Sequence, residues 1–182
     1  DVILHRSRFF FFFNVLHYSI KDTPMRFLLV DRFLHLEPFV SVQAVKNVSM
    51  ESPYFEHHFP GMPVFPGVLT LEAMAQASGF FVMRSVDICE QRKVFAMLNA
   101  SRSRWMQAVR PGDQIIIDAQ YLGGDASHAR TRTTATVAGK LVARAELSFA
   151  LKAYNDEPEF AAAKAQMEML RRALAHDPLI RL

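Results

Sequence analysis

Residues 56–83, EHHFPGMPVFPGVLTLEAMAQASGFFVM, decide the fold of this chain. A histidine pair opens the stretch, a loop dense in Pro and Gly follows, and an almost wholly apolar segment completes it. Pro66 followed by helix-forming residues predicts a helix that begins at a rigid turn and runs to about Arg84. A helix that is apolar on nearly every face is buried. Glu72 is the only charge between Phe65 and Met83, and a buried carboxylate is costly unless it is paired or used in chemistry.

Strand patterns lie on both sides of this predicted helix. The last of them alternates along residues 141–151, with apolar side chains at the odd-numbered positions and Arg144, Glu146 and Ser148 between them. Such alternation is typical of a half-buried antiparallel strand. Expected strands span residues 27–36, 39–48, 55–59, 94–98, 114–122, 129–137 and 141–151, with turns at 110–113, 123–125 and 138–140. We therefore expect an α+β domain in which one long helix packs against the concave face of an antiparallel sheet.

Composition sets the broad class. The 182 residues suit one domain, and 51% hydrophobic with 21% charged residues is ordinary for a globular chain. A net charge of +3 is too small to indicate nucleic-acid binding. One cysteine, Cys89, excludes an internal disulfide framework and favours a reducing, cytoplasmic compartment. No apolar run reaches the roughly 18 residues of a membrane span, and the seven histidines lack metal-ligand spacing.

The chain divides into three pieces. Residues 1–24 form an N-terminal extension with a Phe-rich run at 9–13 that is too short for a signal peptide and has no cleavage site after it. Residues 25–153 carry the predicted domain. Residues 154–182 are Ala-rich with helically spaced apolar positions, which predicts an amphipathic C-terminal helix ending before Pro178.

Residues 58–72 hold the groups best suited to chemistry. A histidine such as His58 can act as a base near neutral pH, because its reference pKa is about 6.5. Burial should raise the pKa of Glu72, so that this glutamate holds a proton to donate. The helix start at Gly67 and Val68 offers unpaired backbone N–H groups to a developing negative charge. Taken singly, His58 also fits a structural role, so the residue types alone leave both readings open.

The stretch HFPGMPVFPGVLTLEAMAQ at residues 58–76 resembles the signature of the 3-hydroxyacyl-[acyl-carrier-protein] dehydratases, the FabZ-like branch of the hotdog fold. The resemblance extends to FLLVDR at 27–32, RSRWMQAVRPGDQ at 102–114 and VAGKLVARAEL at 137–147. It covers about residues 27–151. It implies a hotdog fold, in which the long helix is wrapped by the antiparallel sheet.

The resemblance also implies an activity. Such enzymes dehydrate 3-hydroxyacyl groups on acyl carrier protein to trans-2-enoyl thioesters, without a cofactor or a metal. They are homodimers, and assembly into a trimer of dimers is left open. Carried over to this sequence, His58 and Glu72 are the catalytic pair and meet across the dimer interface. The backbone N–H of Gly67, with that of Val68, binds the thioester oxygen, and Gln76 supports Glu72. Glutamate rather than aspartate at 72 points to the FabZ-like branch.

Several positions depart from the family pattern. Trp105 stands where Phe is usual, Ala108 where Pro is usual and Ser101 where Asp is usual, which leaves the substrate length open. Met62 occupies a position where a charged side chain is common, so carrier docking is expected to be weaker. Arginines supply a basic surface for an acidic carrier, or simply keep a sheet face soluble: Arg102, Arg104, Arg110, Arg130 and Arg132.

Two other functions compete with the dehydratase. A hotdog thioesterase would use a carboxylate to activate water and would not need His58. A catalytically silent acyl-binding or assembly subunit would need neither His58 nor Glu72, and the presence of both argues against it.

Overall fold

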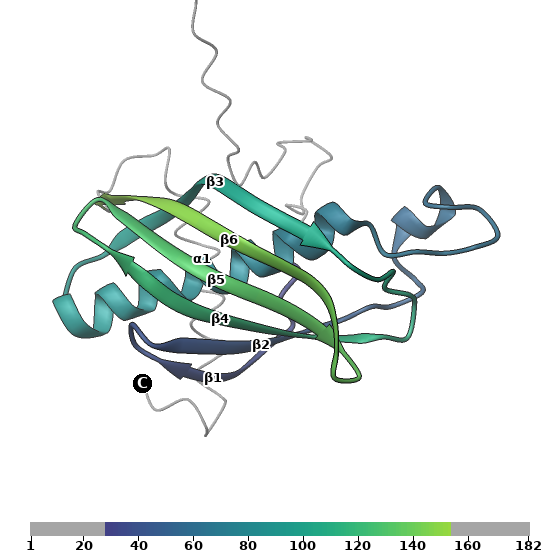
Figure 1. The fold of residues 1–182 in the computed structure, drawn as a ribbon, viewed down its shortest axis with the longest axis horizontal. Helices are drawn as coiled ribbons and strands as arrows, with labels where there is room; N and C mark the ends of the chain where they lie inside the picture. The colour runs from purple at the N-terminus through teal and green to yellow at the C-terminus, as the bar shows by residue number, and fades with distance from the viewer. Residues whose placement is uncertain (1–27, 154–182) are drawn as a thin grey trace, which may run out of the picture.

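The computed structural model describes residues 28–153, so the predictions for the N-terminal extension, 1–24, and the C-terminal helix, 154–182, lie outside the described residues. Figure 1 shows a long helix lying against a curved sheet. The elements in chain order are β1 Arg32–Glu37, β2 Ser41–Asn47, the 3-10 helix η1 Pro53–Glu56, α1 Gly67–Glu90, β3 Val94–Trp105, β4 Gln114–Gly124, β5 His128–Val137 and β6 Lys140–Ala153.

The six strands form one sheet in the order β1-β2-β4-β5-β6-β3, with every neighbouring pair antiparallel. The sheet curves around α1, which contacts β2, β3, β4, β5 and β6 (Figure 1). Side chains of the helix and of the concave sheet face together make the core. This is the α+β arrangement that the sequence pattern predicts and the hotdog fold that the family resemblance implies.

The helix α1 is largely buried, as its composition predicts, with 13 of its 24 residues in the buried class. It runs beyond the predicted end at Arg84, because Ser85 and Val86 still face the core. Gln91 then ends it in the left-handed region, at a φ of 53°. Over the described residues, no helix combines the length and the apolarity needed to cross a bilayer.

The edge strand β3 is longer than predicted and ends at Trp105 rather than at residue 98. The second half of β3 is polar and has no strand pattern of its own. It is extended because it pairs with β6. Cross-strand partners share a face of a sheet. Ser103 lies opposite buried Ala145, whereas Arg104 lies opposite exposed Arg144, so the two faces of the edge strand are clearly distinguished.

Residues 55–59 do not form the predicted strand. Pro53 starts η1 instead, and the turn is closed by local hydrogen bonds from the N–H of Phe55 to the carbonyl of Ser52 and from that of His58 to Tyr54. A proline with a run of local donors favours a tight helical turn over an extended strand. His58 therefore leaves a turn and enters the loop before α1.

Two smaller predictions also fail. Gly123 and Gly124 lie inside β4, and the turn falls later, where the carboxylate of Asp125 accepts hydrogen bonds from the backbone of Ser127 and His128. In β6 a bulge places Leu141, not Val142, beside Thr136. Leu141 is consequently 37% exposed rather than buried, while the rest of the predicted alternation holds.

Candidate active site

The loop before α1 fixes the ring of His58. The Nδ1 atom of His58 lies 2.8 Å from the carbonyl oxygen of Val64, and the backbone N–H of Val64 donates back to the carbonyl of His58. A carbonyl only accepts, so Nδ1 carries the hydrogen and Nε2 is left with a free lone pair. The ring packs on Phe59, and the peptide bond between the two residues is cis. His58 is therefore held in the tautomer that acts as a base through Nε2.

Glu72 lies in the second turn of α1 and is partly buried. Burial raises the pKa of its carboxyl above the ordinary value of 4.5, and a hydrogen bond from Gln76 offsets part of that rise. The Nε2 atom of Gln76 donates to Oε1 of Glu72 at 3.0 Å. The predicted support of Glu72 by Gln76 is present as a contact, and the raised pKa favours a proton on the carboxyl.

The first turn of α1 leaves two backbone donors open. The N–H groups of Leu69 and Thr70 both bond to the carbonyl of Pro66. Among the described residues, no hydrogen bond engages the N–H of Gly67 or Val68, and Pro66 provides no side-chain cap. These two N–H groups stand at the positive end of the helix dipole, where negative charge is stabilised.

The indole of Trp105 packs against Gly67 at the start of α1. Its indole Nε1–H donates to the carbonyl oxygen of Gly67 at 2.8 Å. A Cβ at residue 67 would lie 2.9 Å from that nitrogen. A larger residue at this position would therefore force the indole to move away from the start of the helix.

A cavity of about 310 Å³ opens beside this helix start. It is lined by Val64 and Phe65 of the loop, Gly67 and Thr70 of α1, Trp105 at the end of β3, residues 106–109 of the β3–β4 connection and Val142 of β6. Its wall is largely apolar. The side chains of His58 and Glu72 do not line it.

Not all the predicted site residues are brought together within one chain. Gln76 contacts Glu72, and Gly67 with Val68 forms the helix start. In the part of the chain that the structure describes, no hydrogen bond or ion pair joins His58 to Glu72, so their pairing stays a prediction. The sequence did not reveal the bond from Trp105 to Gly67. The sequence feature that could have indicated this bond is Trp105 itself, because its indole N–H is a hydrogen-bond donor, whereas the Phe usual at this position has none.

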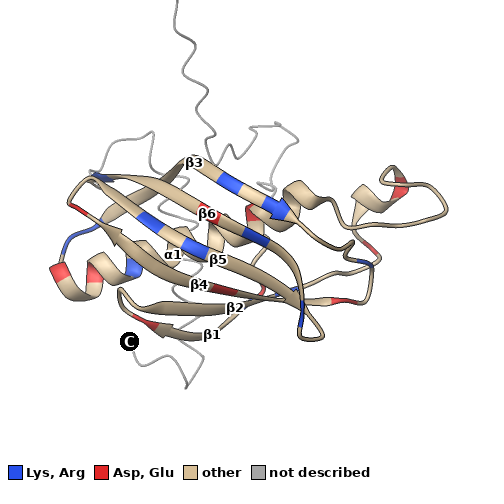
Figure 2. Ribbon diagram, in the orientation of Figure 1, with Lys and Arg blue, Asp and Glu red and all other residues tan. Residues whose placement is uncertain are grey.

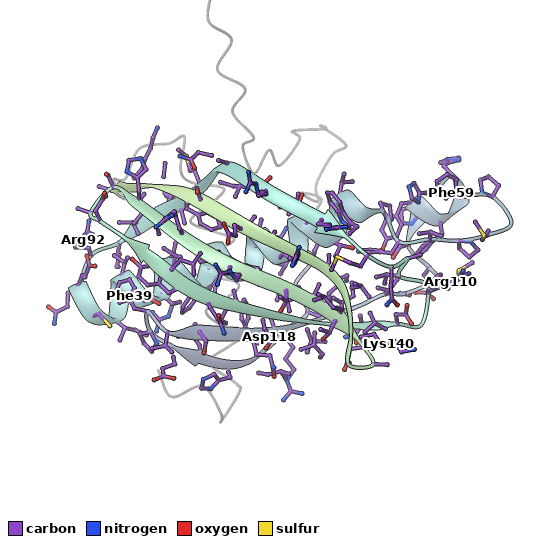
Figure 3. The ribbon with its side chains drawn as sticks, viewed as in Figure 1. Phe39, Phe59, Arg92, Arg110, Asp118 and Lys140 are labelled. Carbon is purple, nitrogen blue, oxygen red and sulfur yellow. The ribbon has the colours of Figure 1, made fainter. Side chains whose placement is uncertain are left out.

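The convex sheet face carries a band of arginines (Figure 2). We call it the arginine face, and its members are Arg102, Arg104, Arg130, Arg132 and Arg144. Arg132 is paired with Glu146 at 3.0 Å. Arg110, which the sequence placed with this group, lies instead in the turn before β4, at the same end of the molecule as Phe59 (Figure 3).

Solved structures with similar folds support the architecture. The protein smu.793 from Streptococcus mutans, bound to acetyl CoA, aligns with a TM-score of 0.53 at 16% identity, over 77% of this chain and 99% of that one. Zebra fish thioesterase superfamily member 2 aligns with a TM-score of 0.53 at 21% identity, over 66% of this chain and 80% of that one. At these identities the likeness shows the fold alone.

Sequence relatives are much closer. A 3-hydroxyacyl-[acyl-carrier-protein] dehydratase FabZ of Erwinia tasmaniensis is 43% identical over 121 residues, covering 66% of this chain and 80% of the relative. The enzyme of the same name from Tolumonas auensis is 43% identical over 124 residues, covering 66% of this chain and 82% of the relative. The family model described as the FabA-like domain matches residues 22–146, which is more than half of the sequence. The chain belongs to the FabA-like domain family.

Proposed function

We propose that this protein dehydrates 3-hydroxyacyl-[acyl-carrier-protein] to the trans-2-enoyl thioester in fatty-acid or related acyl-chain synthesis. Identity of 41–43% to relatives named for that reaction supports the assignment. The structural observation that carries it is Glu72, an acid in an apolar helix whose pKa is raised by burial. A raised pKa favours the protonated carboxyl, the form that can donate a proton to a departing hydroxyl.

The chemistry uses only side chains and backbone of the protein. Nε2 of His58 removes the proton from the carbon beside the thioester carbonyl. The negative charge that develops on the carbonyl oxygen is stabilised by the N–H groups of Gly67 and Val68. Glu72 then protonates the hydroxyl, the carbon–oxygen bond breaks and water leaves. His58 ends protonated and Glu72 ends ionised, and return of one proton through solvent resets the pair. No cofactor takes part in this proposal.

We place the catalytic pair between two copies of the chain. Within one chain, over residues 28–153, no hydrogen bond or ion pair links His58 to Glu72, and β3 is an edge strand with no partner on its outer side. Apolar side chains beside the site are exposed, including Val68 at 69% and Phe59 at 54%. An open strand edge and an exposed apolar patch together favour a homodimer.

The reaction is tested in the reverse direction by hydration of a crotonyl thioester, followed by loss of the enoyl absorbance. His58→Ala and Glu72→Gln should each lose about 100-fold or more. His57→Ala is the matched control, because it removes the neighbouring exposed histidine and should retain full activity. Full activity in either catalytic-pair variant, with the fold intact by circular dichroism, would refute the proposal.

The shared site has its own test. In a mixed dimer of His58→Ala and Glu72→Gln chains, one site carries both changes and the other carries neither. Statistical exchange of subunits should therefore restore about a quarter of the wild-type activity. No recovery on mixing, with exchange confirmed by mass spectrometry, would place the pair within one chain. The same mass measurement distinguishes dimers from a trimer of dimers.

The thioesterase alternative predicts release of free thiol from the same substrates, which a thiol reagent detects. The silent acyl-binding subunit predicts neither reaction. The similarity to the zebra fish thioesterase structure favours neither alternative, because at that identity it shows only that the two proteins share a fold. The cytoplasmic location favoured by the single cysteine stays a prediction.

We also propose that the arginine face docks the carrier protein. Arg104 lies directly opposite Arg144 across the β3–β6 ladder. Among the described residues neither side chain has an ion-pair partner. Like charges placed opposite each other destabilise a sheet, and an acidic partner relieves them. The strand that carries Arg104 continues directly into Trp105 at the cavity, so a carrier bound here is close to the site.

Docking is separated from chemistry by comparing substrates. Arg104→Ser and Arg144→Ser should raise KM for the carrier-linked substrate, more so at low salt, and leave kcat unchanged. A short pantetheine-like thioester should be turned over normally by both. Arg92→Ser is the matched control, because Arg92 is a partly exposed arginine at the other end of the molecule (Figure 3), where it is paired with Glu90. An equal effect of all three substitutions would contradict docking at this face.

A further inference from the structure

The side-chain amide of Gln76 is held in one orientation. Its Oε1 atom accepts a hydrogen bond of 2.8 Å from the backbone N–H of Leu29. Both residues are buried, with Gln76 4% and Leu29 8% exposed. A backbone N–H can only donate, so the atom facing it must be the amide oxygen. Turning the amide over would bring two donors together in a buried place, which is costly.

The fixed oxygen determines what Gln76 presents to Glu72. The amide nitrogen is left on the other side, where it donates to Oε1 of Glu72 at 3.0 Å. An amide nitrogen never accepts, so Oε1 of Glu72 must be the acceptor in both the neutral and the ionised acid. In the neutral acid the carbonyl oxygen is the stronger acceptor, so this hydrogen bond favours the hydrogen on Oε2.

We propose that Gln76, oriented by the Leu29 amide, is a positioning residue that assigns the transferable proton of Glu72 to Oε2. This rests on the proposed function, in which Glu72 protonates the leaving hydroxyl. Gln76 itself does not touch the substrate. It decides which carboxyl oxygen delivers the proton, and it stabilises the carboxylate that remains after delivery.

The position of the Leu29 amide is itself fixed by the fold. Leu29 and Val30 belong to the buried core, and two residues later the N–H of Asp31 joins the ladder to the carbonyl of Val45. The carboxylate of Asp31 also bonds to Lys46. The segment that enters β1 is therefore anchored to β2 on one side and to the helix through Gln76 on the other. The segment at Leu29, which is distant in sequence from Glu72, thereby fixes the orientation of the amide that contacts the Glu72 carboxyl.

The direct test is an NMR titration of protein labelled with ¹³C at the glutamate carboxyl. The Glu72 signal is identified by its absence in Glu72→Gln. Gln76→Met keeps the side-chain length but has no N–H donor, so the Glu72 titration should move up by about one pH unit. Gln76→Glu should also move it up, because two adjacent carboxyls hold one proton to higher pH. If Gln76→Met does not fold, the isosteric Gln76→Glu decides alone.

Ser85→Ala is the matched control. Ser85 is on the same helix, is buried, and accepts a hydrogen bond from the backbone N–H of Phe39 at 3.0 Å, as Gln76 does from Leu29. It has the same kind of structural role but does not touch Glu72. Ser85→Ala should lower the unfolding temperature and leave the Glu72 titration unchanged.

Kinetics complete the test. Gln76→Met should lower kcat by about 10-fold or more, because the proton donor is misplaced, with KM little changed. An unchanged Glu72 titration in folded Gln76 variants, with Glu72→Gln inactive, overturns this inference alone. Activity retained by Glu72→Gln overturns the proposed function instead, whatever the titration shows.

Discussion

Replacing Gly67 with alanine should displace Trp105 from the start of α1. The added Cβ would lie 2.9 Å from Nε1, 3.1 Å from Cδ1 and 3.3 Å from Cε2 of the indole. The ring cannot retreat without lengthening its 2.8 Å hydrogen bond to the Gly67 carbonyl. Losing that bond costs about 1 kcal/mol, and crowding of this kind costs about 1–3 kcal/mol in a packed site. The low end applies here, because Trp105 is 44% exposed and free to swing outward.

The opposing term is helix propensity, which favours alanine over glycine by up to about 1 kcal/mol. The net loss of stability for Gly67→Ala is therefore expected to be about 1 kcal/mol, or roughly 2–4 °C in Tm for a chain of this size. In a Trp105→Ala background the crowding is gone and only the propensity gain remains, so the sign should reverse. The coupling energy between the two positions should be about 1–2 kcal/mol.

Urea unfolding of the wild type, both single variants and the double variant measures this coupling. A matched comparison is Gly79→Ala, where the nearest atom to an added Cβ is 3.5 Å away on Phe149, and where Trp105 should have no influence. If the effects of Gly67→Ala and Trp105→Ala add within about 0.5 kcal/mol, the indole does not hold the helix start and the reasoning fails.

Three further outcomes are expected. Because the folded-state pKa of Glu72 is raised, this carboxyl keeps its proton to higher pH in the folded protein than in the unfolded chain, so its contribution to stability is lost as pH rises from about 4.5 through the folded pKa. Glu72→Gln should consequently match the wild type near pH 4 and unfold at a higher temperature at pH 7–8, and equal melting at both pH values would contradict this. Ser78→Ala should cost about 1–3 kcal/mol in urea unfolding, because its buried hydroxyl bonds to that of Thr133 at 2.8 Å, and a loss below about 0.5 kcal/mol would show that water replaces the bond. Arg144→Gln should stabilise the isolated protein by a few tenths of a kcal/mol at low salt by relieving Arg104, and an effect that persists at 1 M salt would not be electrostatic.

The sequence predicted the helix and the sheet because both have strong local signals. The helix α1 is apolar on nearly all faces. The strands β4 to β6 alternate apolar and polar residues and are joined by tight turns. The ends were less accurate where they depend on distant partners. β3 continues to Trp105 only because β6 lies beside it, and α1 ends at Gln91, which carries no glycine signal. The bulge that exposes Leu141 likewise arises from pairing with β5.

At the site, the sequence predicted residue types but not their orientation. Nothing in the local pattern shows that the Val64 carbonyl selects the tautomer of His58. The bond from Leu29 to Gln76 joins residues 47 positions apart and requires the fold to be known. Burial of Glu72, by contrast, followed directly from its apolar neighbours, and its raised pKa agrees with that prediction.

The strand order has a consequence for how the chain is made. β6 is synthesised last of the described strands, yet it lies between β5 and β3 in the sheet. Until β6 emerges from the ribosome, β3 has no neighbouring strand to pair with. The apolar face of α1 that packs against β3 then stays exposed to solvent. A nascent chain stalled at the Ala138–Gly139 turn should therefore bind chaperones and resist refolding, because long-range strand pairing comes late. Removing β6 would separate β3 from the other four strands, rather than shorten the sheet by one edge strand.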